Sequence, residues 1–311
     1  FDASQLSALD MMMREQYSAL IGAAGTGKTT VMAGYLPKIR DKVREIDWGH
    51  ARSAGTDPSG IMRPAIALCT FTNVAAMNLA AKLPEEWAQH CMSIHSLLAF
   101  APVDLDYADG TRTQRFEPRY TKLNPMPYRV VIIDEVGIVS RDLWDQVYDA
   151  LLPEAQVIFL GDIAQLPAMR GVSPMPFAMK KWPTKVLDTI HRQKGTSSII
   201  PNLTRIRKGM FPEHSPADFR CDKAEKLEEH TLKARDQITR YIAYLHQNGV
   251  WDPKQDIIIT PENNAALGQA YFNGAFRFAF NPVVDDLGRQ ITTALKNKGR
   301  EVNPPIMVRT A

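Results

Sequence analysis

Mostly apolar runs recur along this chain between polar stretches. Five of them occupy residues 17–21, 64–71, 128–133, 155–160 and 256–261. Apolar runs of this length are typical of strands buried on both faces of a parallel sheet. We therefore expect an α/β fold in which the first four runs form one parallel sheet and the last opens a second α/β unit.

Apolar residues at helical spacing fill the intervals between these runs. This spacing predicts helices over residues 6–12, 30–36, 140–152 and 223–246. Ser4 is the expected N-cap of the first helix, with Gln5 as its neighbour. Pro37 and the polar segment 47–60, rich in Gly, Ser, Asp and Pro, are expected to interrupt regular structure, the segment as a surface loop.

The first apolar run leads into a glycine-rich turn. The turn reads Gly22-Ala23-Ala24-Gly25-Thr26-Gly27-Lys28-Thr29, followed by Thr30. It satisfies G-x-x-x-x-G-K-[ST], the phosphate-binding P-loop, in which backbone N–H groups converge on phosphate oxygens. Lys28 would add charge for the β- and γ-phosphates, and Thr29 a hydroxyl for Mg²⁺. A chance match in a flexible glycine loop is the alternative, which the preceding strand and following helix disfavour.

Two acids and a glutamine follow later strands of the predicted sheet. Asp134 and Glu135 come directly after residues 128–133. At a strand end beside a P-loop, Asp134 is expected to hold Mg²⁺ opposite Thr29. Glu135 is expected to orient or deprotonate the attacking water, although the pair could also simply start a helix. Gln165, in the turn after residues 155–160, is placed to sense the γ-phosphate.

Polar and basic residues elsewhere suggest a second ligand. Thr72 and Asn73 follow the second strand, where they serve either a ligand or a helix cap. Residues 101–127 contain an Asp-Gly turn signal and predict a β-hairpin insertion. The hairpin interleaves basic and aromatic residues, which either grip single-stranded nucleic acid or lie on a solvated loop. These residues are Arg112, Arg115, Phe116 and Arg119.

Composition changes this picture only slightly. With 311 residues the chain is long enough for two domains. Its net charge of +3 is too small to indicate a nucleic-acid partner, although residues 170–208 hold nine Lys or Arg and one acid. That run reads equally as a solvated surface. The three cysteines lack metal or redox spacing, and no apolar run suits a membrane. We therefore expect a cytoplasmic protein without a membrane partner, in the host cytoplasm if a phage encodes it.

Taken in order, these segments resemble the motifs of a superfamily 1 helicase of the 5′-to-3′ branch, the RecD-like and Dda-like enzymes. The resemblance covers most of residues 4–273. It rests on the glycine turn, on the acid pair, and on three further stretches: Phe71-Thr72-Asn73-Val74-Ala75-Ala76, Ser93-Ile94-His95-Ser96 and Gly161-Asp162-Ile163-Ala164-Gln165-Leu166-Pro167. The last is the most discriminating, because the 3′-to-5′ branch matches only its Gly-Asp-x-x-Gln part.

The resemblance implies roles that spacing alone leaves open. Gln5 corresponds to an adenine-reading glutamine, and Thr72, Asn73 and His95 correspond to DNA contacts. Arg192, within His191-Arg192-Gln193, corresponds to an arginine that contacts the γ-phosphate. The resemblance further implies ATP and Mg²⁺ as cofactors, single-stranded DNA and duplex junctions as substrates, and replication or recombination proteins as partners. The hairpin stands where the family carries a strand-separating pin.

The resemblance also implies two RecA-like domains. The first covers residues 1–182, with the 101–127 insertion, and the second, incomplete, covers residues 183–311. Nothing after residue 281 resembles the family's last two motifs. We therefore expect either part of an ATP-driven helicase that moves 5′ to 3′, or a relative that binds nucleic acid under ATP control without motor activity. A P-loop kinase or small-molecule ATPase is a third alternative, which Asn73 and Gln165 disfavour.

Overall fold

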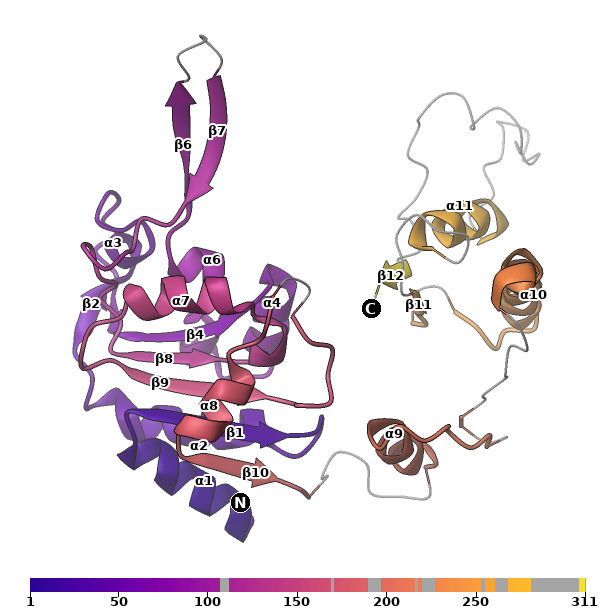
Figure 1. The fold of residues 1–311 in the computed structure, drawn as a ribbon, viewed down its shortest axis with the longest axis horizontal. Helices are drawn as coiled ribbons and strands as arrows, with labels where there is room; N and C mark the ends of the chain where they lie inside the picture. The colour runs from indigo at the N-terminus through magenta and orange to yellow at the C-terminus, as the bar shows by residue number, and fades with distance from the viewer. Residues whose placement is uncertain are drawn as a thin grey trace. The chain divides into compact units, whose positions relative to one another are not determined.

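The chain divides into two units, Phe1–Pro212 and Glu213–Ala311, and each is described by itself. Figure 1 shows the computed structural model of all 311 residues. The structure describes residues 1–106, 112–168, 171–189, 197–215, 218–219, 227–252, 255–260, 268–280 and 308–310. The first unit contains the candidate sites and is treated more fully.

A six-stranded parallel sheet forms the centre of the first unit. Its order is β10 (Thr184–Leu187), β1 (Tyr17–Gly22), β9 (Gln156–Gly161), β8 (Val130–Ile133), β4 (Ile66–Thr70) and β5 (Cys91–Ser93). The first four apolar runs of the sequence are β1, β4, β8 and β9, side by side in this sheet, so the α/β prediction is confirmed. Two short edge strands, β5 and β10, complete it.

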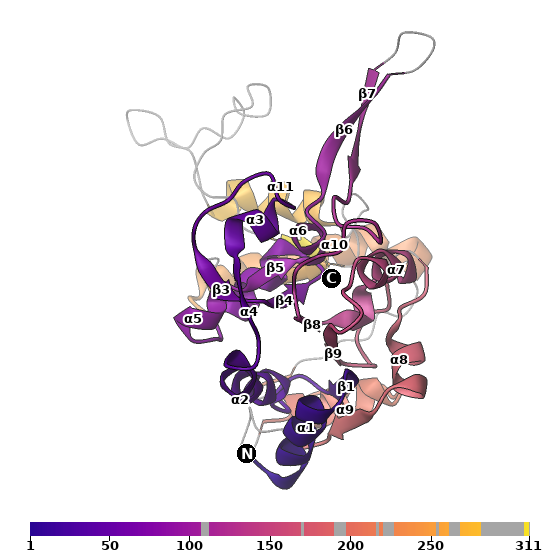
Figure 2. The same ribbon diagram turned by 90° about the vertical axis from the view of Figure 1, so that its left-hand side faces the viewer.

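Helices cover both faces of the sheet, as Figures 1 and 2 show. Leu20 points into a core with α1 (Ala3–Arg14), α2 (Lys28–Arg40), α4 (Asn73–Ala80) and α5 (Glu85–Ala88). Its neighbour Ile21 points to the other face, where a second core includes α3 (Trp48–Arg52), α6 (Ile94–Leu97), α7 (Arg141–Asp149), α8 (Met175–Lys181) and the 3-10 turn η1 (Val136–Ile138). Because successive side chains of a strand alternate between faces, a strand covered on both sides must be apolar throughout.

Three local expectations were wrong. Asp2, not Ser4, caps α1: its Oδ1 accepts the Gln5 N–H at 2.8 Å, and Gln5 Oε1 accepts the Asp2 N–H at 3.1 Å. Pro37 lies inside α2, where burial of that helix's apolar face outweighs one missing backbone bond. The segment 47–60 is not all loop, because it contains α3, and it is flanked by a short antiparallel ribbon of β2 (Glu45–Asp47) and β3 (Met62–Pro64).

The predicted hairpin is present and projects from the body of the unit (Figures 1 and 2). It consists of β6 (Ala101–Asp106) and β7 (Arg112–Glu117), paired antiparallel from Ala101 opposite Glu117 to Asp106 opposite Arg112. The expected Asp-Gly turn at residues 109–110 lies outside the described residues. The hairpin residues are mostly exposed, so its position depends on the segment that joins it to the sheet.

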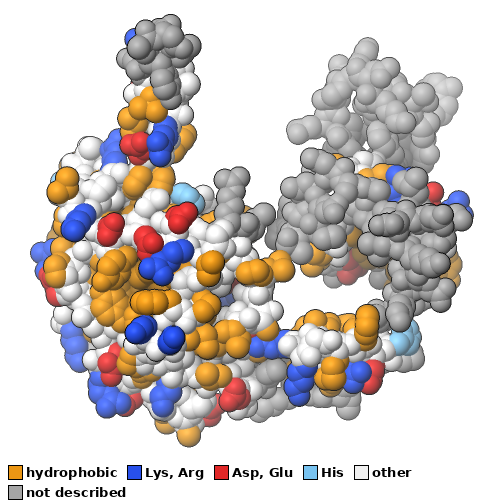
Figure 3. All heavy atoms as spheres, viewed as in Figure 1, with side chains coloured by type: hydrophobic (Ala, Val, Ile, Leu, Met, Phe, Trp, Pro, Cys, Tyr) orange, Lys and Arg blue, Asp and Glu red, His pale blue; other side chains and the backbone are white. Residues whose placement is uncertain are grey.

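Hydrophobic side chains gather on the face that α7 and α8 cover, in the view of Figure 3. Trp144, Phe159 and Trp182 pack edge to face or tilted, with ring centroids 4.6–5.9 Å apart. Tyr148 and Phe177 beside them remain about half exposed. This aromatic cluster joins α7 to the segment that precedes β10, and it thereby fixes the edge of the sheet.

The boundary predicted after residue 182 lies too early, because β10 follows it and pairs with β1 in the first sheet. The first unit also contains α9 (Ile199–Arg207). In the second unit the expected strand at 256–261 is β11 (Ile258–Thr260), parallel to β12 (Val308–Thr310). Helices α10 (Leu227–Gln247) and α11 (Gln269–Phe280) complete its described part, with a small core of Ile242, Phe272 and Phe276. Within the ranges described, the chain has no helix with the length and apolarity to cross a membrane.

Candidate nucleotide site and nucleic-acid interface

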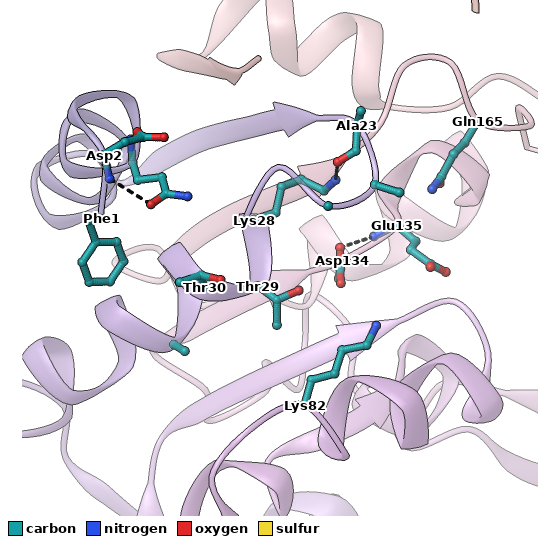
Figure 4. A pocket seen from close by; sticks show the side chains of 15 residues that line it. Phe1, Asp2, Ala23, Lys28, Thr29, Thr30, Lys82, Asp134, Glu135 and Gln165 are labelled. Atoms are coloured by element: carbon teal, nitrogen blue, oxygen red, sulfur yellow. Dashed lines mark hydrogen bonds between the residues drawn. The ribbon is translucent and has the colours of Figure 1, made fainter. Parts of the chain in front are cut away.

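A cavity of about 930 Å³ lies over the glycine turn, at the carboxyl ends of β1 and β8. Figure 4 shows the side chains that line it. Most of the predicted nucleotide residues contribute: Gln5, Ala23, Ala24, Gly25, Gly27, Lys28, Thr29, Thr30, Asp134, Glu135 and Gln165. Gly22 and Thr26 do not line the cavity but support its wall, where the Thr26 hydroxyl donates to the Ala23 carbonyl at 2.9 Å.

The turn requires glycine for two reasons. Gly25 and Gly27 have φ angles of 84° and 91°, in the left-handed region that other residues rarely adopt. A Cβ at Gly27 would also lie 2.4 Å from Nε2 of Gln5. The backbone can thus approach a ligand without side chains in between, and Gly27 precedes the first turn of α2, whose N–H groups favour an anion. These features fit a triphosphate.

Lys28 is held by the turn itself. Its Nζ donates to the carbonyl oxygens of Gly22 at 2.5 Å and Ala23 at 3.1 Å. Burial lowers the pKa of Lys28, and the carboxylates of Asp134 and Asp162 oppose this effect, while Arg207 adds to it. A phosphate group would offer this ammonium a charged acceptor in place of neutral carbonyls.

The two adjacent acids differ in surroundings. Burial raises the pKa of Asp134, although the Glu135 N–H, which donates to its Oδ1 at 2.9 Å, and Lys28 oppose this rise. Burial and the neighbouring Asp134 raise the pKa of Glu135. Glu135 also has a φ of 55°, a strained conformation for a residue with a Cβ. The hydroxyl of Thr29 and the carboxylate of Asp134 face the same cavity, and oxygen ligands of this kind suit Mg²⁺.

Gln5 lines the cavity from α1, and Gln165 lines it from the turn after β9. Gln5 is buried, and its Nε2 donates to the Thr26 carbonyl at 3.4 Å, which ties α1 to the glycine turn. Gln165 is exposed on a turn whose backbone is fixed by Asp162. The Ala164 N–H donates to Asp162 Oδ1 at 3.0 Å, and the Gln165 N–H donates to the Asp162 carbonyl at 3.2 Å.

A second cavity, of about 530 Å³, lies at the base of the hairpin. It brings together four of the residues predicted to contact nucleic acid: Asn73, His95, Phe116 and Arg119. The His95 ring packs against the rings of Phe71 and Phe100, with centroids 6.3 and 5.0 Å away. We refer to this cavity as the groove. Exposed rings beside an arginine and neutral polar groups suit the bases and phosphates of a single strand.

Other predicted residues lie outside the groove. The Thr72 hydroxyl accepts the Ala75 N–H at 3.1 Å and so caps α4, the alternative that the sequence left open. Arg112 and Arg115 are on β7 beyond the groove, where Arg115 is 3.4 Å from Glu117. Arg192 lies outside the described residues.

Sequence reasoning missed several residues at both cavities. Arg52 and Ser53 line the groove from the segment expected to be a loop, and Ser96 and Phe100 line it beside His95. Lys82, just after α4, points toward Asp134 and Glu135 across the nucleotide cavity (Figure 4). Ser96 lies in the motif stretch beside His95, which could have marked it. Arg52, Phe100 and Lys82 lie outside the motifs and could have been marked only by their basic or aromatic character, and Ser53 carries no such signal.

Comparisons with known proteins give the family of the chain. The sequence model of the family described as an AAA domain matches residues 1–230. The ATP-dependent RecD2 DNA helicase of Deinococcus radiodurans is 26% identical over 278 residues, which are 89% of this chain and 32% of RecD2. The RecBCD enzyme subunit RecD of Mycobacterium tuberculosis is 28% identical over 179 residues, 54% of this chain and 27% of that subunit. The chain thus spans about a third of these relatives or less.

Among solved structures, the Pif1 helicase from Bacteroides in complex with ADP-AlF3 and ssDNA has a TM-score of 0.47 with this chain. It is 17% identical, and the similarity covers 88% of this chain and 56% of that protein.

Proposed function

Because the chain belongs to the AAA domain family and is a RecD- and Pif1-like member of helicase superfamily 1, we propose that it is the ATPase part of an ATP-dependent DNA helicase. Its relatives carry the names of ATP-dependent DNA helicases and of a RecBCD subunit. The family resemblance of the motifs further supports translocation in the 5′-to-3′ direction along single-stranded DNA.

One helix carries this proposal. Helix α4 begins at Asn73, which lines the groove, and is followed by Lys82, which lines the nucleotide cavity. Its eight residues span roughly 12 Å. A shift of α4 would therefore move groups at both cavities at once. A protein needs such a connection if ATP hydrolysis is to change its affinity for DNA.

The nucleotide cavity supports the following roles. The N–H groups of residues 22–30 and the Lys28 ammonium bind the phosphates, and Gln5 borders the space for the base. Thr29 and Asp134 would hold Mg²⁺, and a bound ion would supply positive charge beside the phosphate oxygens. Glu135 accepts a proton from the attacking water, and its raised pKa leaves it a better base than an exposed glutamate. Gln165 contacts the γ-phosphate, and Arg192 contributes a second charge there.

The groove supports a single strand of DNA as the ligand. Asn73 and His95 contact the strand, Phe116 stacks on a base, and Arg119 pairs with a phosphate. Arg112 and Arg115 extend this surface along the hairpin, which would meet a duplex at a junction. Thr72 acts through its cap of α4 and fixes Asn73. We propose that replication or recombination proteins are the partners of the helicase.

The test is steady-state ATP hydrolysis with and without single-stranded DNA. We would compare the 311-residue chain, a version extended at its C-terminus, and each with Glu135→Gln. DNA should stimulate hydrolysis in the extended version, and Glu135→Gln should abolish the stimulated rate while ATP binding persists.

Two results would contradict the proposal. If DNA does not change the rate of ATP hydrolysis in either version, the protein is not a DNA motor. ATP-dependent DNA binding without turnover would instead favour a nucleic-acid-binding module that ATP switches. Loss of ATP binding in Glu135→Gln would reassign that residue to a structural role.

A further inference from the structure

Asp162 links two segments that the sequence gives no reason to connect. Its side chain is only 4% exposed, and its Oδ2 accepts a hydrogen bond from Nη1 of Arg207 at 2.6 Å. Its Oδ1 accepts the Ala164 N–H at 3.0 Å, and its carbonyl accepts the Gln165 N–H at 3.2 Å. One residue therefore holds both the Gln165 turn and the last residue of α9.

The charge of Arg207 matters to this arrangement. Burial raises the pKa of Asp162, but the hydrogen bonds from Arg207 and from the Ala164 N–H lower it below its ordinary range overall. The carboxylate therefore stays ionised, with both oxygens occupied. If Arg207 moved away, the buried charge would keep only the Ala164 N–H as a hydrogen-bond donor and the charge of Lys28 as compensation, and the turn would lose its fixed position.

Arg207 also lies near the cavity itself. It is among the groups whose charge acts on Lys28, together with Asp134 and Asp162. Its side chain is 34% exposed, so it reaches the buried carboxylate from a solvent-facing helix end. After α9 the chain runs through Pro212 into the second unit. The position of α9 thus bears directly on the turn that carries Gln165.

We propose that Arg207 is a positioning residue, whose ion pair with Asp162 fixes the Gln165 turn and makes ATP hydrolysis depend on the placement of α9. Arg207 does not contact the reacting atoms in this arrangement. It acts through Asp162. The inference rests on the proposed ATPase function, but its first test does not require hydrolysis.

The first test is amide hydrogen exchange of the 311-residue chain without nucleotide. Arg207→Ala should speed exchange at Ala164 and Gln165 about tenfold, because a charge-assisted hydrogen bond is lost. Asp162→Asn retains an oxygen for the Ala164 N–H but no charge for Arg207, and should give a similar change. Arg207→Lys should recover part of the protection. Lys208→Ala, at the exposed neighbouring cation, is the matched control and should leave exchange as in wild type.

The second test is ATP hydrolysis with single-stranded DNA in the C-terminally extended version. Arg207→Ala and Asp162→Asn should each lower kcat about tenfold with KM for ATP within about twofold, and the double variant should be no worse than either single variant.

Equal effects on exchange throughout β9 would mean that the ion pair only adds stability, and the proposal would be wrong. Additive effects in the double variant, or wild-type behaviour of Arg207→Ala, would also overturn it. If wild type neither binds nor hydrolyses ATP, the proposed function fails, whereas the exchange result still decides whether Arg207 positions the turn.

Discussion

One wall of the nucleotide cavity is the backbone of the glycine turn, whereas the groove is lined by side chains from several segments of the chain. Residues 23–25 and 27–30 form that wall of the first cavity. The groove combines Arg52, Asn73, His95, Phe100 and Phe116 from α3, α4, α6, the segment after α6 and β7. A site made of backbone depends on the conformation of that backbone, so few substitutions are tolerated at the glycines that adopt it. A side-chain site depends on how distant segments pack.

This difference predicts that a single substitution can impair one cavity while the other keeps its function. The largest effect is expected for Lys28→Ala, which removes the ammonium held by the glycine turn. ATP hydrolysis should fall about a hundredfold or more, since one charged donor to the transferred phosphate is lost. The affinity for single-stranded DNA without nucleotide should not change, as measured by fluorescence anisotropy.

Lys38→Ala is the control for that variant, because Lys38 is exposed near the other end of the same helix. Hydrolysis by Lys38→Ala should equal that of wild type. A Lys28→Ala variant with normal turnover would mean that the turn does not hold the phosphates.

A smaller effect is expected for Phe116→Ala in the groove. This ring is 63% exposed without a ligand, and stacking of a base on an exposed ring contributes about 1–3 kcal/mol. The affinity for single-stranded DNA should therefore fall about tenfold, with nucleotide affinity unchanged. Leu123→Ala, at a side chain that is 96% exposed, is the control. Equal losses in both variants would exclude a specific stack.

The salt dependence of DNA binding tests how far the interface extends along the hairpin. Arg119→Ala should reduce the slope of log affinity against log salt by about one, because one phosphate contact is lost. Replacement of Arg112, Arg115 and Arg119 together should reduce it further if the hairpin arm also touches phosphates. If the triple variant matches Arg119→Ala, the interface ends at the groove.

The smallest effect is expected for Tyr120→Phe, which tests how the groove is held together. The buried Tyr120 hydroxyl donates to the Ala51 carbonyl at 2.5 Å, next to the Arg52 that lines the groove. Loss of this bond should lower the free energy of unfolding by about 1 kcal/mol. DNA affinity should fall slightly while ATP affinity stays constant. An equal change in both affinities would mean that the two cavities share one packing unit.

Much of the sheet domain could be predicted from the sequence, for identifiable reasons. The strands that became β1, β4, β8 and β9 are buried on both faces, so their apolar runs are unbroken. Asp134 and Glu135 follow one such strand, and parallel strands end at one edge, which brings them to the glycine turn. The N-cap of α1 was open to the same local reasoning, because Gln5 stands three residues after Asp2 and completes a capping box with it, whereas Ser4 has Ser7 at that distance.

The sequence by itself determined the features that depend on neighbours along the chain. The glycine turn is one, since its φ angles need glycine whatever surrounds it. The unbroken apolar runs that distinguish these buried strands from amphipathic helices are another. The tertiary structure alone decided which side chains meet across long separations: Arg119 with Asn73 in the groove, β10 beside β1, and Arg207 with Asp162. These contacts form because packed cores bring distant segments together, and no local period records which polar groups will then face one another.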